Sequence, residues 1–353
     1  MERINKGPIL KPTDNKWESN AVFNPGAIKD KNGKIHILYR AVGNYEDYVN
    51  RLGHAIFTYN KDDKELKLKK RSKKPVFSPE FLRKNKILER LVGRDEKVGV
   101  EDPRIARVKV DGKEKYWLTI VLVTNPDAPP QIRRKAGLSK LKDRKWQAYT
   151  LLTEIKIKNG KTVFSKDPKD YWIITPRDRT DKDVVPFPKK INNKTYFLER
   201  RAKPGMDMNI PNNRTRLSTQ ISYLDEENMV LKEAKEIIPL KNKWESWKNG
   251  PGIPPIETKE GFLEIYHGVN KKKEYRAGAC LFEKNNPEKI IKRTNKPILQ
   301  PEKEWEKEGD TPNVVFPTGC VRVDNELILF YGTADKYCGA ARAKIEDIFN
   351  WER

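Results

Sequence analysis

The residues best suited to do chemistry in this sequence lie in one short segment, Gly99-Val-Glu-Asp-Pro-Arg-Ile105. This segment places two carboxylates, Glu101 and Asp102, beside a rigid proline and Arg104. Such a cluster is costly to bury unless its charges are paired or used, and enzymes often use carboxyl groups with shifted pKa values as acids and bases. The segment therefore predicts either a functional pair of carboxylates or a turn held by an ion pair between Asp102 and Arg104.

Five short apolar or aromatic segments recur along the chain and must form the framework that positions this cluster. They cover residues 34–41, 115–122, 194–201, 261–268 and 326–333, and each is rich in β-branched and aromatic residues, as strands are. Their sixth residues are 39, 120, 199, 266 and 331, so the spacing lies between 65 and 81 residues. A long repeat of this kind indicates an array of similar structural units.

Each recurring strand has similar neighbours in the sequence. A Pro- or Gly-rich segment precedes it, as in Asn24-Pro-Gly26 and Gly250-Pro-Gly252, and a strand of small residues follows it, as in Arg276-Ala-Gly-Ala-Cys280. This pattern predicts an all-β fold, a five-bladed β-propeller formed by residues 1–353 as one domain, because a single four-stranded blade must stack on neighbours to bury both faces. We expect the small residues to line the crowded axis.

Two other features of the pattern complete the predicted fold. Helical periodicity is confined to short stretches such as residues 79–92. Two ordinary β-sandwiches are the alternative to a propeller.

Composition narrows the function classes. The formal net charge is +23, with 73 Lys and Arg against 50 Asp and Glu, which favours anionic partners without naming one. The basic residues are mostly lysines scattered among glutamates, and no nucleic-acid-binding signature accompanies them. Three widely spaced cysteines fit neither a disulfide framework nor a metal site, and no apolar run is long enough for a membrane span or signal segment. We therefore expect a cytoplasmic protein with reduced cysteines, bound to neither membrane nor nucleic acid.

Several motifs, in order along nearly the whole chain, resemble family 130 of the glycoside hydrolases. This family contains β-mannoside phosphorylases and some β-mannosidases on a five-bladed propeller. The motifs are Gly99-Val-Glu-Asp-Pro-Arg-Ile105, Lys182-Asp-Val-Val-Pro-Phe-Pro188, Gly250-Pro-Gly-Ile-Pro-Pro-Ile256, Gly261-Phe-Leu-Glu-Ile-Tyr-His-Gly-Val269, Tyr275-Arg-Ala-Gly-Ala279, Asn313-Val-Val-Phe316 and Tyr331-Gly-Thr-Ala-Asp335.

The resemblance implies that Asp102 is the general acid. In such an enzyme a carboxyl group with a raised pKa protonates the leaving oxygen, by way of a mannose hydroxyl, while phosphate attacks the anomeric carbon from the opposite face. One displacement inverts that centre and gives α-mannose 1-phosphate. The enzyme then needs no cofactor, only inorganic phosphate as a co-substrate and cations to hold it.

The resemblance also implies ligands for phosphate and for the sugar. For phosphate we expect basic or aromatic side chains from several blades, namely Arg133, Arg134, Lys182, Lys248, Tyr266 and His267. The pair Arg200 and Arg201 fills a position where many members carry His-Arg, with Glu199 in place of the histidine. For the sugar we expect Asn24, Arg40, Arg51, Glu101 and Asp335.

The leading hypothesis is thus an inverting phosphorylase for a β-mannoside of the manno-oligosaccharide or mannosyl-glucose type. One alternative is an inverting β-mannosidase in which Glu199 or Glu264 activates water. Another is a non-catalytic propeller that binds glycans or nucleic acid. No metal site is expected, because the three histidines lie at 36, 54 and 267 with no cysteine pair nearby. By analogy with the family we expect an assembly of identical chains.

Overall fold

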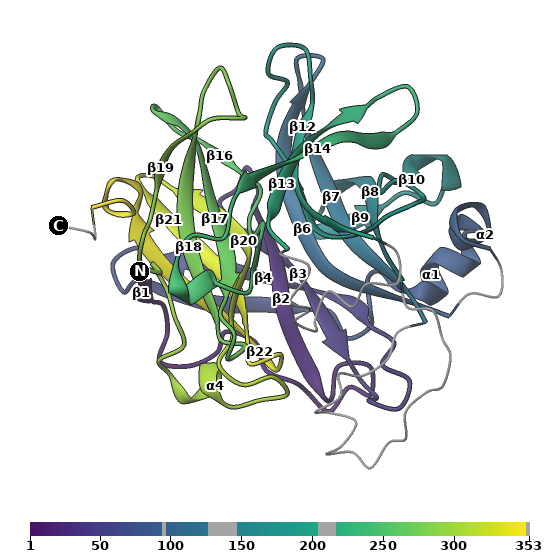
Figure 1. Cartoon of the computed structure of the whole chain (residues 1–353). Coiled ribbons are helices and arrows are strands. Elements are labelled where there is room, and N and C mark those ends of the chain that lie inside the picture. Colours follow the sequence, from purple (N-terminus) through teal and green to yellow (C-terminus); the bar gives the residue numbers. More distant parts are fainter. Residues whose placement is uncertain (94–96, 126–146, 204–216, 351–353) are drawn as a thin grey trace.

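The protein is a five-bladed β-propeller, as the repeat predicted. Its computed structural model describes residues 1–93, 97–125, 147–203 and 217–350, whose strands form five sheets around a common axis (Figure 1). Sequence neighbours pair antiparallel within each sheet, so every blade is an up-and-down meander that begins with its innermost strand.

The strands divide among the blades in chain order. Blade 1 contains β2 (Ala21–Lys29), β3 (Ile35–Val42), β4 (Arg51–Asn60) and β5 (Glu65–Arg71). Blade 2 contains β6 (Val98–Val110), β7 (Lys113–Thr124), β8 (Gln147–Lys158) and β10 (Tyr171–Ile173), with β9 (Lys161–Phe164) paired to β8. Blade 3 contains β11 (Thr180–Pro186), β12 (Tyr196–Ala202), β13 (Thr219–Asp225) and β14 (Val230–Ile238).

The last two blades complete the ring. Blade 4 contains β15 (Lys248–Gly250), β17 (Gly261–Val269), β18 (Tyr275–Glu283) and β19 (Ile290–Arg293), with β16 (Ile256–Glu257) paired to β17. Blade 5 contains β20 (Val315–Val323), β21 (Glu326–Thr333), β22 (Tyr337–Lys344) and, from the other end of the chain, β1 (Glu2–Arg3). The short helices are α1 (Pro79–Lys84), α2 (Ile87–Leu91), α4 (Glu304–Lys307) and the 3-10 turns at Pro168–Asp170, Lys243–Glu245 and Ile345–Asp347.

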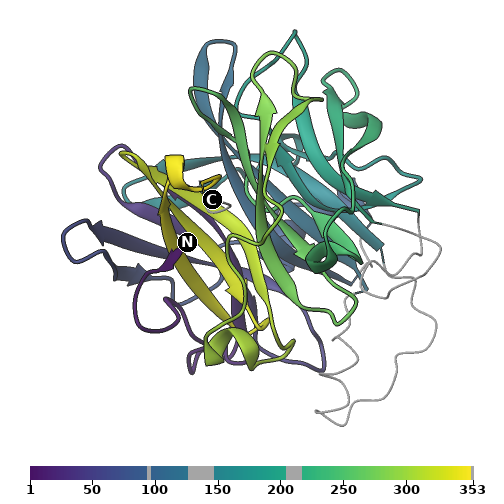
Figure 2. The same cartoon turned by 60° about the vertical axis from the view of Figure 1, so that its left-hand side comes forward.

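The N-terminal strand closes the ring. β1 is the outer strand of blade 5, paired antiparallel with β22 near the C-terminus, and Figures 1 and 2 show the two segments side by side. The Met1 amino group donates a 2.9 Å hydrogen bond to the Ile298 carbonyl, and Arg3 bonds the buried Glu306 carboxylate. Strands from both ends of the chain are thus held in one sheet.

The small-residue strands do not line the axis, which corrects our expectation. The recurring segments are the second strands (β3, β7, β12, β17 and β21), and the Pro- or Gly-containing segments before them form the innermost strands (β2, β6, β11, β15 and β20). The small residues lie on third strands, where Gly53, Gly278 and Gly339 make room for a tyrosine. A Cβ at these glycines would lie 2.2, 2.8 and 2.7 Å from the ring of the tyrosine opposite.

These tyrosines belong to a polar set that recurs in blades 1, 4 and 5. In each blade, a tryptophan packs near the tyrosine ring, and the residue that follows this tryptophan in the sequence is a buried glutamate. An arginine from the outermost strand of the blade forms an ion pair with that glutamate. The three sets are Tyr39–Glu18–Arg71, Tyr266–Glu245–Arg293 and Tyr331–Glu306–Arg3. Glu199 occupies the equivalent strand position in blade 3 and bonds Arg201 instead.

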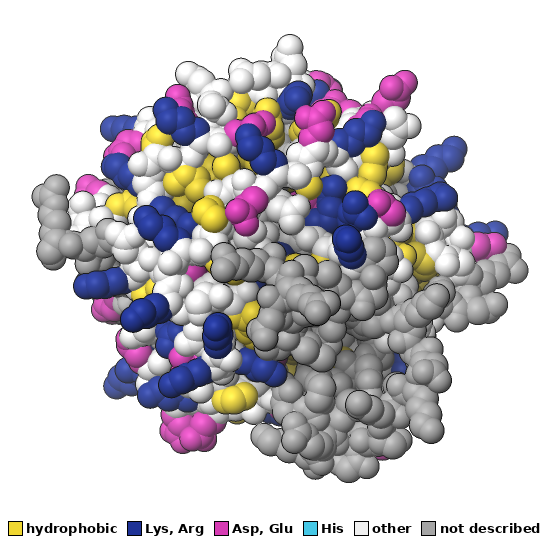
Figure 3. Space-filling view, viewed as in Figure 1, with side chains coloured by type: hydrophobic (Ala, Val, Ile, Leu, Met, Phe, Trp, Pro, Cys, Tyr) yellow, Lys and Arg dark blue, Asp and Glu magenta, His cyan; other side chains and the backbone are white. Residues whose placement is uncertain are grey.

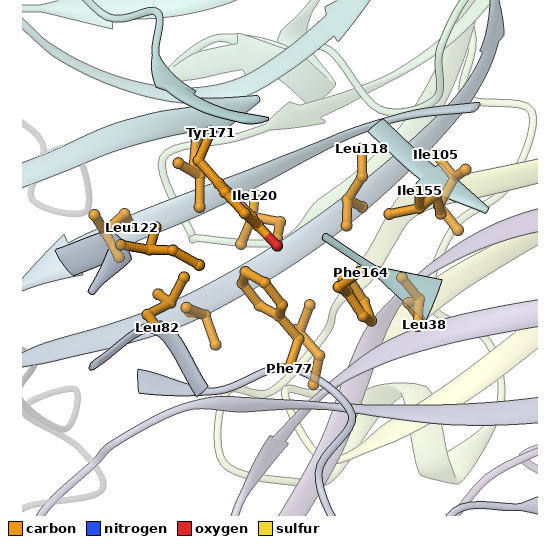
Figure 4. Close-up of a cluster of buried hydrophobic side chains, with 14 of the residues drawn as sticks. Leu38, Phe77, Leu82, Ile105, Leu118, Ile120, Leu122, Ile155, Phe164 and Tyr171 are labelled. Atoms are coloured by element: carbon orange, nitrogen blue, oxygen red, sulfur yellow. The ribbon is translucent and has the colours of Figure 1, made fainter. Parts of the chain in front are cut away.

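Apolar side chains fill the space between blades. In the cluster between blades 1 and 2, the ring centre of Phe77 lies 4.7 Å from that of Phe164 and 6.2 Å from that of Tyr171, both in blade 2, and Leu38 of blade 1 belongs to the same cluster (Figure 4). Helices α1 and α2 contribute Leu82 and two further residues to it, as the helical periodicity near residues 79–92 indicated. Burial of this apolar surface is the main force that holds neighbouring blades together.

The surface carries the expected mixture of charges. Figure 3 shows Lys and Arg spread over the visible face with Asp and Glu among them. All three cysteines are free, and Cys280 and Cys338 are buried. No helix in the described part of the chain is long and apolar enough to cross a membrane.

Candidate active site

Three innermost strands carry a polar residue at the same irregular position. The strand register shifts at Asn24 in β2, at Asp102 in β6 and at Asp183 in β11, and each residue has a left-handed backbone with φ of 50°, 47° and 64°. Asn and Asp adopt this conformation more readily than other non-glycine residues, and a bulge re-aims the side chain that it carries. The bulges explain how three polar side chains from different blades gather at one end of the axis.

Asp102 is held by two donors from blade 1. Its Oδ1 accepts hydrogen bonds of 2.8 Å from Asn24 Nδ2 and 3.0 Å from Arg40 Nη1. Glu101, one residue earlier, accepts from Arg40 Nη2 at 2.8 Å and from Asn50, and lies 3.4 Å from Lys182 Nζ. Arg40 therefore fixes both carboxylates, which are 4% and 5% exposed.

Asp102 does not have the raised pKa that we expected of a general acid. Burial acts to raise its pKa, but Arg40, Lys182 and Arg104 outweigh burial and hold the pKa below the usual value for aspartate. In the protein without ligand, Asp102 is a carboxylate at neutral pH. An anion bound near these cations would offset their charge and raise the pKa, because like charges disfavour ionisation.

Four side chains that can bind an anion lie next to this pair, and we refer to Lys182, Arg200, Lys248 and His267 as the basic cluster. All four are at most 8% exposed. Arg200 Nη1 and both ring nitrogens of His267 are buried without a hydrogen-bond partner among the described residues. The Lys248 ammonium lies 4.8 Å from the Trp247 ring centre and 5.3 Å from that of Tyr275. Buried donors without partners are costly, so they indicate a polar ligand.

His267 is neutral in this setting. Burial chiefly, aided by repulsion from Arg200 and Lys248, lowers its pKa to about 3, although Asp183 acts in the opposite direction. Its ring lies against Phe316, with centres 4.6 Å apart, and Tyr275. A neutral imidazole has one donor and one acceptor nitrogen, so His267 can donate one hydrogen bond to a ligand.

A glycine faces the basic cluster, and the side chains of the cluster pack directly against it. A Cβ at Gly250 in β15 would lie 2.7 Å from His267 Cε1, 2.9 Å from Asp183 Oδ2 and 3.0 Å from Arg200 Nε. A side chain at this position would therefore displace the groups that face the anion.

Asp335 follows β21 and lies close to the acidic pair. It is partly buried, and burial chiefly raises its pKa to about 6, with Asp310 and Asp102 adding to the effect and Thr311 and Arg40 opposing it. Asn24 Oδ1 has no hydrogen-bond partner within the described residues. A group that can donate or accept and a free amide oxygen suit the hydroxyls of a sugar.

Other expected site residues lie elsewhere. Tyr266 belongs to the recurring set described above, with its hydroxyl 3.1 Å from Arg293 Nε, so the structure gives it a packing role away from the basic cluster. Arg51 bonds Glu80 at a partly exposed position and is not brought to Asp102. Arg133 and Arg134 lie outside the described residues.

The structure adds Asp183, Arg104 and Tyr275 to the site. It also separates two adjacent arginines, because Arg200 lies in the basic cluster whereas Arg201 bonds Glu199. All of them lie in or beside motifs quoted above. An alignment of the five repeats would have identified Asp183, because it occupies the same position as Asn24 and Asp102. In each blade, the residue just before it pairs with the seventh residue of the recurring segment on the second strand.

A cavity of about 430 Å³ lies between the opposite ends of the innermost strands and includes Ala27, Ala106, Pro186 and Cys320 in its lining. It contains none of the polar residues that converge on Asp102. The cavity is therefore separate from the polar residues around Asp102.

Comparison with known proteins decides the family. Residues 2–353 match the model of glycoside hydrolase family 130, described as β-1,4-mannooligosaccharide phosphorylase. The chain belongs to this family. A family 130 relative, the 1,2-β-oligomannan phosphorylase of Thermoanaerobacter sp. (strain X514), is 33% identical over 99% of this chain and 98% of its own length. A β-1,2-mannobiose phosphorylase of the same strain is 31% identical over the same shares.

A solved family 130 structure has the same fold. It is the β-1,2-mannobiose phosphorylase of Listeria innocua in complex with β-1,2-mannobiose, which aligns with a TM-score of 0.67 and 21% identity, covering 99% of this chain and 98% of that one. The resemblance inferred from the motifs is thereby confirmed, and the protein is an enzyme of the β-mannoside phosphorylase type.

Proposed function

We propose that this enzyme cleaves β-1,2-linked mannosides with inorganic phosphate and releases α-mannose 1-phosphate with inversion. The observation that carries the proposal is the basic cluster, where Arg200 Nη1 and the two ring nitrogens of His267 are buried without a hydrogen-bond partner in the described part of the chain. They lie beside the carboxylate pair that belongs to a glycosidase site. The names of two full-length relatives, a 1,2-β-oligomannan phosphorylase and a β-1,2-mannobiose phosphorylase, support the β-1,2 linkage.

The reaction assigns a task to each side of the site. Asp102 delivers its proton to the leaving glycosidic oxygen, which departs as the acceptor hydroxyl. A phosphate oxygen held by Arg200, Lys248 and His267 forms the new bond to the anomeric carbon from the opposite face. Bidentate arginine contacts suit phosphate especially well.

The lowered pKa of Asp102 is consistent with this order of events. Arg40, Lys182 and Arg104 keep Asp102 ionised in the ligand-free protein. Phosphate bound to the neighbouring Lys182 and Arg200 brings at least one negative charge close to Asp102. That charge offsets the effect of the surrounding cations and raises the pKa of Asp102. Phosphate binding thus prepares the acid for its proton.

The hydrolase alternative requires Glu199 or Glu264 to act as the base that activates water, and neither is well suited to this role. Glu264 is fully buried, accepts a 2.8 Å hydrogen bond from the Gly252 amide, and has a pKa that burial raises well above the usual value. Glu199 is bonded through both oxygens to Arg201 in the interior of blade 3. The burial of both carboxyls and the partners that they already have favour phosphate over water as the nucleophile.

The test measures products from β-1,2- and β-1,4-mannobiose with and without inorganic phosphate. We expect α-mannose 1-phosphate from the β-1,2 substrate, only when phosphate is present. Free mannose formed at an equal rate without phosphate would establish the hydrolase. Turnover of the β-1,4 substrate alone would contradict the proposed linkage, and no turnover of either would favour a binding propeller.

A further inference from the structure

Asp183 is a buried carboxylate that takes no part in the proposed chemistry. It is 1% exposed, and its pKa is lowered because Arg200, Arg104, His267 and Lys182 together outweigh the opposing effect of burial. It is therefore ionised. A buried charge of this kind persists only if its partners and hydrogen bonds offset the loss of hydration.

One oxygen of Asp183 determines how Arg200 points. Oδ2 lies 2.8 Å from Arg200 Nε and 2.7 Å from Arg200 Nη2. These two contacts occupy one edge of the guanidinium, and they leave Nη1, the atom without a partner among the described residues, directed away from the carboxylate. His267 Nε2, which also has no hydrogen-bond partner among the described residues, lies 3.9 Å from the same oxygen.

The other oxygen of Asp183 binds the arginine that supports the acid. Oδ1 accepts a 2.8 Å hydrogen bond from Arg104 Nη2. Arg104 in turn donates to the Asp102 carbonyl at 3.2 Å and to the Gly252 carbonyl at 3.0 Å. Asp183 thus connects the backbone of the acid in blade 2 with an anion-binding arginine in blade 3.

We propose that Asp183 is the positioning residue of the phosphate site, which aims the free edge of Arg200 at phosphate and fixes that arginine relative to Asp102. This inference rests on the proposed function. Asp183 acts only through Arg200, Arg104 and His267 and does not touch a reacting atom. An inverting displacement needs the nucleophile and the acid on opposite faces of one carbon. A fixed distance between Arg200, which holds phosphate, and Asp102 therefore favours the reaction.

The test compares Asp183→Asn with Asp181→Asn. Both aspartates are buried in β11, but Asp181 faces Glu199, and burial together with Glu199 raises its pKa well above the usual value, so asparagine closely mimics its neutral form. For Asp183→Asn we expect the KM for phosphate to rise at least tenfold while the KM for the mannoside changes less than twofold. Asp181→Asn should leave both constants within twofold of the unmodified enzyme.

Calorimetry with inorganic phosphate separates the two levels of inference. If the unmodified protein binds no phosphate, the proposed function itself fails. If it binds phosphate and Asp183→Asn binds equally well, the positioning role is overturned while the function stands. Equal increases in both KM values, or a lower melting temperature with unchanged KM values, would also overturn it, since either would indicate a purely structural role.

Asp183→Glu covers the case in which the asparagine variant does not fold. Glutamate keeps a negative charge among the arginines but moves the carboxylate by one methylene. Arg200 therefore keeps a counter-ion but is no longer held in the same orientation. We expect the same selective rise in the phosphate KM, at least fivefold. A phosphate KM equal to that of the unmodified enzyme would contradict the proposal.

Discussion

Arg40 Nη1 lies 3.0 Å from Asp102 Oδ1, so an arginine is bonded to the side chain proposed as the acid. The same guanidinium contacts Glu101 at 2.8 Å. Arg40 therefore orients the carboxylates but also keeps Asp102 ionised, together with Lys182 and Arg104. A site arranged in this way acquires its acid when an anion joins it, which makes phosphate both the nucleophile and the group that prepares the acid.

Replacing Asp102 with asparagine should abolish turnover with little effect on binding. Asparagine keeps the shape and one acceptor for Asn24 and Arg40 but carries no acidic proton, and general acids contribute about 10²–10⁴-fold in rate. We expect the rate of mannose 1-phosphate release to fall by about that factor. Phosphate binding measured by calorimetry should persist, and a variant with unchanged activity would remove Asp102 from the catalytic role.

Replacing His267 with alanine should weaken phosphate selectively. A hydrogen bond to a charged group contributes about 1.5–3 kcal/mol, so the KM for phosphate should rise roughly tenfold to a hundredfold. His54→Ala is the matched control, because His54 is also a buried histidine but lies in blade 1, bonded to His36. Steady-state kinetics with varied phosphate measures the effect. Equal phosphate KM values for the two variants would mean that the phosphate site has been misplaced.

Two glycines should separate the two halves of the site. Alanine at Gly250 places its Cβ 2.7 Å from His267 Cε1, whereas alanine at Gly332 places it 1.9 Å from Asn24 Oδ1. We expect G250A to raise the KM for phosphate at least tenfold and G332A to raise mainly the KM for the mannoside. The same pair of saturation curves checks both. If the two variants gave the same kinetic pattern, the division into phosphate and sugar sides would be wrong.

Asp335 should make stability depend on pH. Burial raises its pKa in the folded state to about 6, from 3.8, so the folded protein holds this proton more tightly than the unfolded chain does. The contribution is complete below pH ~4 and is lost as pH rises through about 6, a decrease of roughly 3 kcal/mol. Asp335→Asn should remove that decrease in denaturant melts between pH 4 and 7. The exposed control Asp62→Asn should retain it.

Ring closure should depend on Arg3. Arg3→Ala leaves the buried Glu306 carboxylate without its arginine and should lower the free energy of unfolding by about 3–5 kcal/mol. The control is Arg342→Ala on the neighbouring strand β22, because Arg342 pairs with the partly exposed Glu326 and the exposed Glu2. That change should cost no more than about 1 kcal/mol. Equal melting temperatures for the two variants would contradict the role of Arg3 in closure.

The amino-acid sequence by itself determined the propeller and the motif around Asp102. Five strands of similar composition at a comparable spacing favour stacking in a ring over two separate β-sandwiches, so the repeat predicted the fold. The cluster Glu101-Asp102-Pro103-Arg104 stood out because its charges needed partners. Both conclusions depend only on residue types and their order.

Tertiary structure alone decided which member of each neighbouring pair enters the site. Tyr266 and His267 are adjacent in β17, yet Tyr266 bonds Arg293 of the outermost strand of the same blade while His267 joins the basic cluster. Arg200 and Arg201 part in the same way in β12. Successive side chains of a strand point to opposite faces, and only the stacking of blades determines which face meets the axis.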